Sequence, residues 1–302
     1  MERFYSLNQH YRETFGEKIY KLSLDGGFSC PNRDGTLGTG GCIFCSEGGS
    51  GDFAQDARFS VKEQIASAKE IFSCKKVGNK YIAYFQAFTN TYGPLSYLEK
   101  IYREALEPEE IVGLAIGTRP DCLPPEVLTL LGDLNKEKPI YLELGLQTIH
   151  EETAAFIRRG YPLPVFEDAV YRAKKAGLQV VCHVILGLPG ETKEMMLDTI
   201  AYLNRLPIDG IKLAMLHVLK GTDLATVYEE SPFPVFTKEE YVDLVIDCIE
   251  ALRTDIVVHR ITGDGPKELL IAPLWSTNKR DVLNSIGKRL KERNTWQGRK
   301  EL

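Results

Sequence analysis

Three cysteines near the start of the chain carry the strongest chemical signal in the sequence. They lie in the segment Cys30-PNRDGTLGTGG-Cys42-IF-Cys45, in which the longer gap is rich in glycine. Glycine-rich backbone can wrap closely around a bulky inorganic ligand. The chain has 302 residues and seven cysteines, an odd number. Free thiols or metal ligands are therefore favoured over the disulfide framework of a small secreted domain.

The number of candidate ligands narrows the kind of site. A structural zinc site or an electron-transfer cluster usually has four protein ligands, and the next cysteine, Cys74, lies well downstream in a predicted helix. Three thiolates on a [4Fe–4S] cluster leave one iron open. An open iron can chelate the amino and carboxylate groups of S-adenosylmethionine (SAM) and pass an electron to its sulfonium. Spacing alone leaves a three-cysteine zinc site and incidental loop thiols as alternatives.

Short apolar segments alternate with helical ones along most of the chain. The apolar segments span 19–26, 80–88, 111–118, 139–147, 178–187 and 210–218, and helices are predicted near 60–73, 96–106, 124–136, 165–176 and 191–205. Strands that are apolar on both faces belong to parallel sheets covered by helices. We therefore expect an α/β fold, either a partial (β/α)6 barrel of the TIM type or an open sheet. Ligands bind at the carboxyl ends of such strands, and the cysteine segment directly follows the first strand.

The pattern changes after about residue 220. Residues 237–253 predict a helix, 255–261 one more strand and 278–293 a final basic helix. We expect a core barrel over 1–220 and a C-terminal α/β extension over 221–302 that packs on it. No apolar signal region and no apolar run long enough to span a membrane occur, so we expect a cytoplasmic protein without a membrane partner.

The motifs at successive strand ends resemble those of the radical SAM superfamily. Within it, the chain is most similar to the elongator-catalytic-subunit-like branch and its small bacterial members of the YtqA/YhcC type, from about Tyr5 to Leu219. The motifs that carry the resemblance are Cys42-Ile-Phe-Cys45, IGTRPD (116–121), ELGLQT (143–148), RRGY (158–161), HVILGLPGET (183–192) and LKGTDL (219–224). The resemblance implies a [4Fe–4S] cluster on Cys30, Cys42 and Cys45, with SAM bound beside it.

The resemblance also assigns SAM contacts at the strand ends. They are Phe44 for the adenine, Thr89 and Asn90 for the amino group, Glu143 or Gln147 for the ribose, Arg158 for the carboxylate, and Ile185 and Gly187 on the fifth strand. Asp25 and Arg119, at the ends of the first and third strands, are candidates for substrate-facing groups.

Charged residues within the later strands have no assigned role in the resemblance. Lys212 and His217 are candidates for the substrate cavity. A lysine inside a barrel strand is costly unless it is paired, so Lys212 either lines the cavity or pairs with a carboxylate such as Glu143. His183, alone in an apolar run, is interpreted as a satisfied core residue.

Relatives in this branch act on the wobble uridine of transfer RNA, so the resemblance implies tRNA as the substrate. A step that suits hydrogen abstraction is the conversion of a carboxymethylaminomethyl group towards an aminomethyl group. A ferredoxin, a flavodoxin or a reductase would supply electrons, and a methyltransferase could act downstream. The net charge of −5 excludes a uniformly basic nucleic-acid binder.

Local features bear on the same question. Residues 279–300 contain eight basic and two acidic residues, which fits either a solvated helix face or a footprint for phosphates. Four aromatic residues could stack on splayed anticodon bases, although each is more often a packing residue: Tyr92, Tyr161, Trp275 and Trp296.

Three other functions remain open. One is a radical SAM enzyme that acts on a small molecule, which would cleave SAM without binding tRNA. A second is a zinc-binding nucleic-acid adaptor, which would contain zinc and no iron. The third is an iron–sulfur electron carrier, which the three-ligand set and the strand-end motifs disfavour.

The cysteine assignment generates a direct prediction. Replacing any one of Cys30, Cys42 or Cys45 with alanine removes a cluster ligand and should abolish reductive cleavage of SAM. Release of 5′-deoxyadenosine by anaerobically purified protein under dithionite measures this. A variant that keeps full turnover would show that its cysteine is not a ligand.

Overall fold

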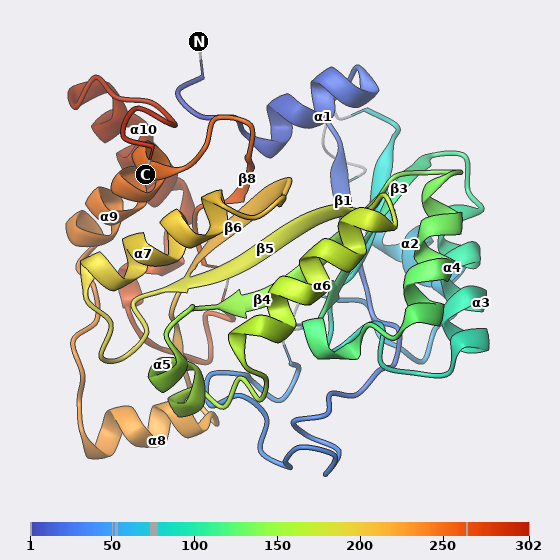
Figure 1. Cartoon of the computed structure of the whole chain (residues 1–302), viewed down its shortest axis with the longest axis horizontal. Helices are drawn as coiled ribbons and strands as arrows, with labels where there is room; N and C mark the ends of the chain where they lie inside the picture. The colour runs from blue at the N-terminus through green and yellow to red at the C-terminus, as the bar shows by residue number, and fades with distance from the viewer. Residues whose placement is uncertain (1, 50, 52–53, 73–77, 264, 302) are drawn as a thin grey trace.

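The parallel sheet expected from the sequence is present and is curled into part of a barrel (Figure 1). This computed structural model describes residues 2–49, 51, 54–72, 78–263 and 265–301. Within those residues, seven strands pair in parallel in the order β1-β2-β3-β4-β5-β6-β8, and β7 pairs with β9 in a small antiparallel sheet. The strands are β1 (Tyr20–Leu24), β2 (Tyr81–Phe85), β3 (Ile111–Thr118), β4 (Ile140–Gln147), β5 (Gln179–Leu186), β6 (Gly210–Met215), β7 (Val218–Leu219), β8 (Val257–Arg260) and β9 (Leu270–Ala272).

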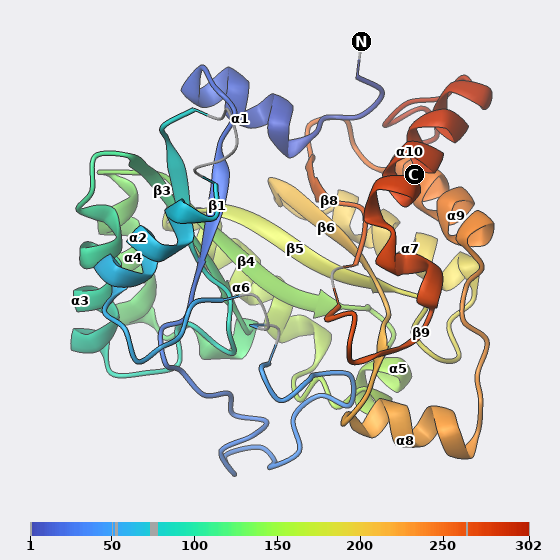
Figure 2. The ribbon, with the colours of Figure 1, turned by 180° about the vertical axis from the view of Figure 1, so that it is seen from behind.

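The helices between the strands cover the outer face of the curled sheet. In Figure 1, α6 and α7 lie in front of it, whereas the view from behind shows the inner face of β4 and β5 with the loop after β1 below it (Figure 2). The helices are α1 (Leu7–Phe15), α2 (Val61–Glu70), α3 (Leu95–Leu106), α4 (Pro125–Asn135), α5 (Glu151–Phe156), α6 (Leu163–Lys175), α7 (Lys193–Asn204), α8 (Asp223–Glu230), α9 (Lys238–Ala251) and α10 (Lys279–Glu292), with short 3-10 turns at Pro120–Cys122 and Leu274–Thr277.

The six predicted strands and the five helices between them are confirmed, each within a few residues. Three helices were not predicted, namely α1, α5 and α8. The strand expected at 255–261 forms as β8 and pairs in parallel with β6, so the last part of the chain extends the main sheet. The division of the chain into a core and an extension near residue 220 stays a prediction.

The two faces of the sheet differ because side chains alternate along each strand. On β4, Leu142 and Leu144 point outward into the large apolar core under the helices. Glu143 and Gln147 point to the inner face and line a cavity. The sheet therefore supplies an apolar outer layer for stability and a polar inner layer for a site.

Helix α1 closes the amino end of the half-barrel. Tyr11 is buried there in a small apolar cluster with Ile82 and Tyr141, and its ring lies 6.0 Å from that of Tyr141. The segment before α1 is held by the end of the chain, since the backbone N–H of Tyr5 donates to Gln297 Oε1 at 2.8 Å and the Gln297 N–H donates to the carbonyl of Arg3 at 2.9 Å.

Replacing Leu142 with alanine tests the outer core. Leu142 is fully buried at the centre of the sheet, and such a truncation costs about 2–5 kcal/mol through lost burial and a residual cavity. Thermal unfolding should show a midpoint lowered by roughly 5 °C or more. The control is Leu283→Ala on α10, where the side chain is 41% exposed; equal melting temperatures for the two variants would contradict the assigned core.

Candidate functional site

A cavity of about 800 Å³ opens at the carboxyl ends of the strands. All three candidate cluster ligands, Cys30, Cys42 and Cys45, line it. Ten further residues singled out in the sequence line the same cavity: Phe44, Thr89, Arg119, Glu143, Gln147, Tyr161, His183, Ile185, Lys212 and His217. Residues that lie far apart in the sequence therefore meet in one place, as the rule for strand ends predicts.

Four of the predicted residues lie elsewhere. The Arg158 guanidinium is half exposed and pairs with the carboxylate of Asp223. The Asn90 amide is fully buried and donates to the carbonyl of Gly117 at 2.8 Å. Gly187 has a φ of +87° and Asp25 Oδ1 accepts the backbone N–H of Gly27 at 2.8 Å. None of these four is among the residues lining the cavity in the described part of the chain. Their roles in binding SAM or substrate stay predictions.

The loop that carries the cysteines is tied together by Arg33. Its guanidinium donates to three successive backbone carbonyls, those of Cys45 at 3.2 Å, Ser46 at 2.5 Å and Glu47 at 3.1 Å. The same guanidinium lies 5.5 Å from the centre of the Phe88 ring. Charge-assisted bonds of this kind are stronger than neutral ones, so Arg33 fixes the second half of the loop around the cavity.

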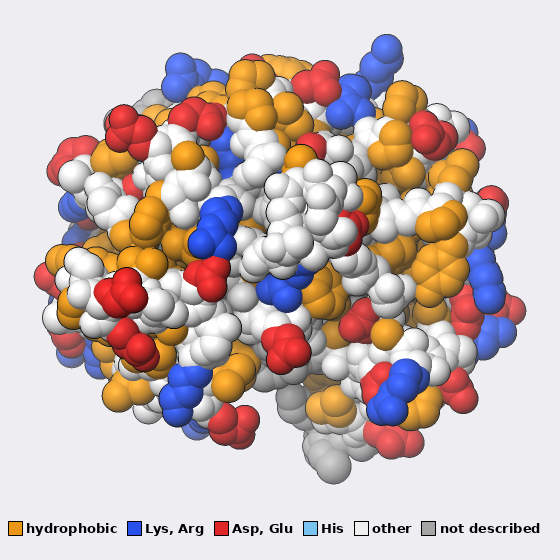
Figure 3. Space-filling model, turned by 90° about the horizontal axis from the view of Figure 1, so that it is seen from below, with side chains coloured by type: hydrophobic (Ala, Val, Ile, Leu, Met, Phe, Trp, Pro, Cys, Tyr) orange, Lys and Arg blue, Asp and Glu red, His pale blue; other side chains and the backbone are white. Residues whose placement is uncertain are grey.

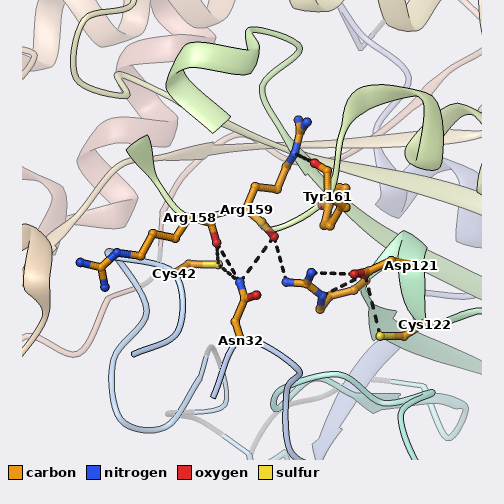
Figure 4. A network of polar contacts seen from close by, with 9 residues as sticks. Asn32, Cys42, Asp121, Cys122, Arg158, Arg159 and Tyr161 are labelled. Carbon is orange, nitrogen blue, oxygen red and sulfur yellow. Dashed lines mark hydrogen bonds and ion pairs between the residues drawn. The ribbon is translucent and has the colours of Figure 1, made fainter. Parts of the chain in front are cut away.

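Asn32 attaches the first half of the loop to the turn after α5 (Figure 4). Its amide nitrogen lies 2.8 Å from the carbonyl oxygen of Arg158, 3.4 Å from that of Arg159 and 3.5 Å from Cys42 Sγ. A side chain at Gly160 would clash with Asn32, because a Cβ there would lie 2.6 Å from Asn32 Oδ1. The RRGY motif thus supplies backbone carbonyls and a glycine that the cysteine loop docks against.

Arg119 reaches the same turn from the end of β3. Its guanidinium pairs with Asp121 at 2.7 Å and donates to the carbonyl of Arg159 at 2.9 Å. It also lies 5.0 Å from the centre of the Tyr161 ring. Arg119 lines the cavity, as expected for a group at a strand end. Some of its N–H donors, however, hold this turn in place.

The hydrogen bond between Cys42 and Cys45 favours the thiolate at Cys42 and the thiol at Cys45. It lowers the pKa of Cys42 to about 7, with Arg119 and Arg33 acting in the same direction, and together with burial it holds the pKa of Cys45 well above its usual range. Thiolates, not thiols, bind metals. Cys30, Cys42 and Cys45 line one cavity, and cysteine thiolates are the ligands that hold iron–sulfur clusters.

The remaining described cysteines are structural, as expected from their apolar surroundings. Cys122, Cys182 and Cys248 are buried, and burial raises the pKa of Cys122 and of Cys248 to about 12. Cys74 lies outside the described residues.

A polar layer lies deeper in the cavity, across the middle of the strands. The Glu143 carboxylate is fully buried and is contacted by Lys21 at 2.6 Å, by His183 Nε2 at 2.9 Å and by the ammonium of Lys212. Lys212 Nζ also lies 3.1 Å from the Tyr84 hydroxyl. Burial disfavours the charged carboxylate, but Lys21 and Lys212 outweigh it and hold the pKa of Glu143 well below its usual range.

Two expectations are resolved by this layer. Lys212 both lines the cavity and pairs with Glu143, as its place in an apolar strand indicated. His183 was interpreted as a satisfied core residue; it is satisfied by Glu143, but it also lines the cavity. Burial lowers the pKa of His183 to about 4, so its imidazole is neutral at pH 7. Sequence reasoning missed Lys21 and Tyr84, whose inward direction is readable only from strand alternation.

Several backbone positions at the strand ends are strained. Phe88, Gln147 and Arg158 have φ values of +58°, +68° and +56°, a region that non-glycine residues rarely adopt. All three lie in the segments that follow β2, β4 and α5, and Phe88 and Gln147 line the cavity. Strain of this kind concentrates at binding sites, where the surrounding contacts hold it.

Replacing Asn32 with alanine tests the docking of the cysteine loop. The change removes the bonds to two carbonyls and to Cys42 Sγ, which together contribute about 1–3 kcal/mol. After reconstitution, the iron content per chain should fall at least severalfold, or the iron should be lost faster to a chelator. Thr36→Ala in the same loop, where the hydroxyl contacts the Tyr92 hydroxyl at 3.0 Å and the Asp34 side chain, should retain the wild-type iron content. Equal iron retention in both variants would show that Asn32 does not hold the loop.

Sequence comparison identifies two known regions in the chain. Residues 35–203 match the model of the radical SAM superfamily, and residues 208–292 match the model of the Radical_SAM C-terminal domain. The first match covers more than half of the chain and includes Cys42 and Cys45, while Cys30 lies just before it.

Individual relatives agree with these matches. The chain is 45% identical over 298 residues to the uncharacterized protein YtqA of Bacillus subtilis. That alignment covers 99% of this chain and 92% of YtqA. It is 40% identical over 266 residues to protein YhcC of Escherichia coli, with 88% and 85% covered. Among solved structures, the archaeal Elp3 of Methanocaldococcus infernus superposes with a TM-score of 0.70 at 17% identity. That superposition covers 92% of this chain and 64% of that chain, and it shows a shared fold.

The position of the cysteine loop at the end of β1, the curled parallel sheet and the sequence matches lead to the same conclusion. The chain belongs to the radical SAM superfamily, whose members use a [4Fe–4S] cluster and SAM.

Proposed function

We propose that this radical SAM enzyme modifies the wobble uridine of tRNA by converting a carboxymethylaminomethyl group towards an aminomethyl group. The carbon beside the carboxylate is oxidised by two electrons with SAM as the oxidant, and water then releases the two-carbon fragment as glyoxylate. The observation that carries the proposal is a single cavity with three cysteines at its mouth and a polar, cation-containing layer below them. A cavity of about 800 Å³ is large enough for a nucleoside-sized ligand. The similarity to the elongator-like branch, which acts on this nucleoside, supplies the substrate class.

When bound, the cluster and SAM supply a carbon radical that removes a hydrogen atom from the substrate. The residues of this chain bind the cluster, orient the substrate and shield the reacting carbon from water. Cys30, Cys42 and Cys45 would hold the cluster at the cavity mouth. The apolar wall at Ile185 and Ala214 limits access of water to the reacting carbon. An external ferredoxin, flavodoxin or reductase is proposed as the electron donor, and a methyltransferase as a later enzyme.

The basic C-terminal segment supports a tRNA substrate less than its composition indicates. Arg293 pairs with Asp247 at 2.6 Å, Lys300 pairs with Glu250 at 2.5 Å, and Arg289 pairs with Asp243. These acidic partners come from α9, against which α10 packs. Acidic and basic side chains are also interspersed on the face where α5 and α8 lie (Figure 3). Support for tRNA therefore comes from the family resemblance and the cavity, rather than from this segment.

The aromatic candidates for stacking on bases separate into two groups. Tyr161 is buried with its hydroxyl on the carbonyl of Gly145, and Trp275 Nε1 donates to the carbonyl of Phe236 at 2.8 Å. Trp275 is a packing residue, whereas Tyr161 also lines the cavity. Tyr92 is half-buried, and its hydroxyl lies 3.0 Å from that of Thr36. Trp296 is 49% exposed with the Arg299 guanidinium 4.9 Å from its ring centre, which makes it the most exposed of the four stacking candidates.

The test is reconstitution on tRNA. Protein with a rebuilt cluster is incubated with SAM, dithionite and tRNA from cells that lack the protein, and the nucleosides are analysed by mass spectrometry. Carboxymethylaminomethyluridine should fall and aminomethyluridine should rise, whereas Cys42→Ala protein should leave both unchanged. An unchanged profile with the wild-type protein, together with 5′-deoxyadenosine release, would refute the tRNA proposal and favour a small-molecule substrate.

A further inference from the structure

The polar layer of the cavity carries more positive than negative charge among the groups that touch Glu143. Two ammonium groups, Lys21 and Lys212, face one carboxylate. The third contact, from His183, is neutral at pH 7 because burial lowers its pKa to about 4. Burial also holds the pKa of Tyr84 well above its usual range, so this hydroxyl carries no charge. The layer is therefore suited to one more anion.

The two lysines retain hydrogen-bonding capacity. An ammonium has three donors. Among the described residues, Lys21 donates to Glu143 alone, and Lys212 donates to Glu143 and Tyr84. Lys212 is 6% exposed at its side chain and lines the cavity, and Lys21 is 16% exposed. Each ammonium can therefore donate a further hydrogen bond to a ligand without breaking a contact.

A purely structural role explains the layer poorly. Burying charges is costly, and replacing a buried ion pair by apolar residues is often neutral or stabilising. The inner face has apolar residues directly below this layer, where Ile82 and Tyr141 pack on Tyr11, and directly above it at Ile185. Burial, with the positive charges of Lys21 and Arg260 nearby, lowers the pKa of Lys212 to about 7. Such a value is expected for an ammonium whose surroundings lack a full counter-charge.

We propose that Lys21 and Lys212, positioned by Glu143, form a carboxylate-binding subsite that receives an anionic group of the substrate. The identity of that group, the carboxylate of a carboxymethylaminomethyl substituent, rests on the proposed function. The charge argument rests on the contacts alone. The subsite would place the carbon beside the carboxylate between the lysines and the cluster loop, since Lys212 and the three cysteines line one cavity and Lys21 lies beside Lys212 on the same Glu143 carboxylate. Lys212 is then a specificity-determining residue.

The first experiment measures discrimination on tRNA. The wild-type enzyme is compared on tRNA that carries the carboxymethylaminomethyl group and on tRNA in which the carboxylate is converted to a neutral amide. We expect kcat/KM for the acid to exceed that for the amide by roughly 30-fold or more, and Lys212→Met to reduce the ratio to within a few fold of one. Lys62→Met on the outer helix α2, where the lysine is 59% exposed, is the matched control and should keep the wild-type ratio. A Lys212→Met enzyme that still prefers the acid overturns the subsite.

The second experiment does not depend on tRNA. N-methylglycine carries the same secondary amine and carboxylate as the substituent, and its binding to reconstituted protein is followed by NMR with a ¹³C-labelled carboxyl group. Binding should weaken about tenfold or more in Lys21→Met and Lys212→Met protein, and the amide of N-methylglycine should bind more weakly than the acid. Equal behaviour of acid and amide, or of wild type and both variants, overturns the subsite. Acid-selective binding without activity on tRNA refutes the proposed function and leaves the subsite standing.

The variants are chosen so that no buried charge loses all of its partners and prevents folding. Lys212→Met leaves Glu143 paired with Lys21 and His183. The triple variant Lys21→Met, Lys212→Met, Glu143→Gln removes both ammonium groups and the carboxylate that they contact, so it avoids an uncompensated charge among them. Melting temperature and iron content are measured for each. The triple variant should lose acid selectivity as the single one does, and retained selectivity in both counts against the proposal.

Discussion

The buried carboxylate of Glu143 is the interaction around which the inner face of the sheet is arranged. It comes from β4 at the centre of the sheet, and its partners come from β1, β5 and β6. Strands separated by more than a hundred residues in the chain are thus connected by one anion. Any rearrangement of the curl that separated these strands would leave a charge buried without a partner, which is strongly unfavourable. The curvature of the sheet and the shape of the cavity are coupled for this reason.

The cysteine loop is positioned by hydrogen bonds from side chains to backbone carbonyls, rather than by a buried charge. It has no regular secondary structure around Cys30 and Cys42, so its position is set by side chains that bond to backbone groups. Asn32 fixes it to the turn after α5, Arg119 holds that turn from the end of β3, and Arg33 fixes the second half of the loop. The backbone carbonyls of that turn accept the hydrogen bonds that set the position of the loop. The loop is therefore held by elements that follow β3 and β4 in the chain, and the site forms only when the central strands are paired.

The sequence predicted the strands well because each is apolar on both faces or ends in a recognisable motif. It also predicted that the cysteines and the strand-end residues share one cavity, since parallel strands present their carboxyl ends on the same side. The direction of individual side chains is less readable from the sequence. Arg158 is predicted to contact SAM from its place in a motif, and in this structure its side chain pairs with Asp223 while its backbone carbonyl accepts a hydrogen bond from Asn32. Its role in binding SAM stays a prediction.

Lys21 shows a second limit of sequence reasoning. Its strand reads IYKLSLDG, in which a single lysine looks like an ordinary exposed charge. Only the pairing of β1 with β2, and the resulting alternation, places it inside the barrel opposite Glu143. The sequence also left the role of the basic residues on α10 open, because their acidic partners on α9 lie more than forty positions earlier in the chain.

The contact between residues 3–6 and residues 295–297 has a consequence for biosynthesis. Residues 3–6 bond to Thr295 and Gln297 and bridge to Val258, so a segment that is synthesised early waits for one that is synthesised almost three hundred residues later. Until residue 297 leaves the ribosome, α1 lacks the neighbours that seat it against the amino end of the sheet, and the nascent half-barrel is open at that end. A chain whose synthesis stops between β8 and residue 297 would have the strands of its main sheet but an unsealed base.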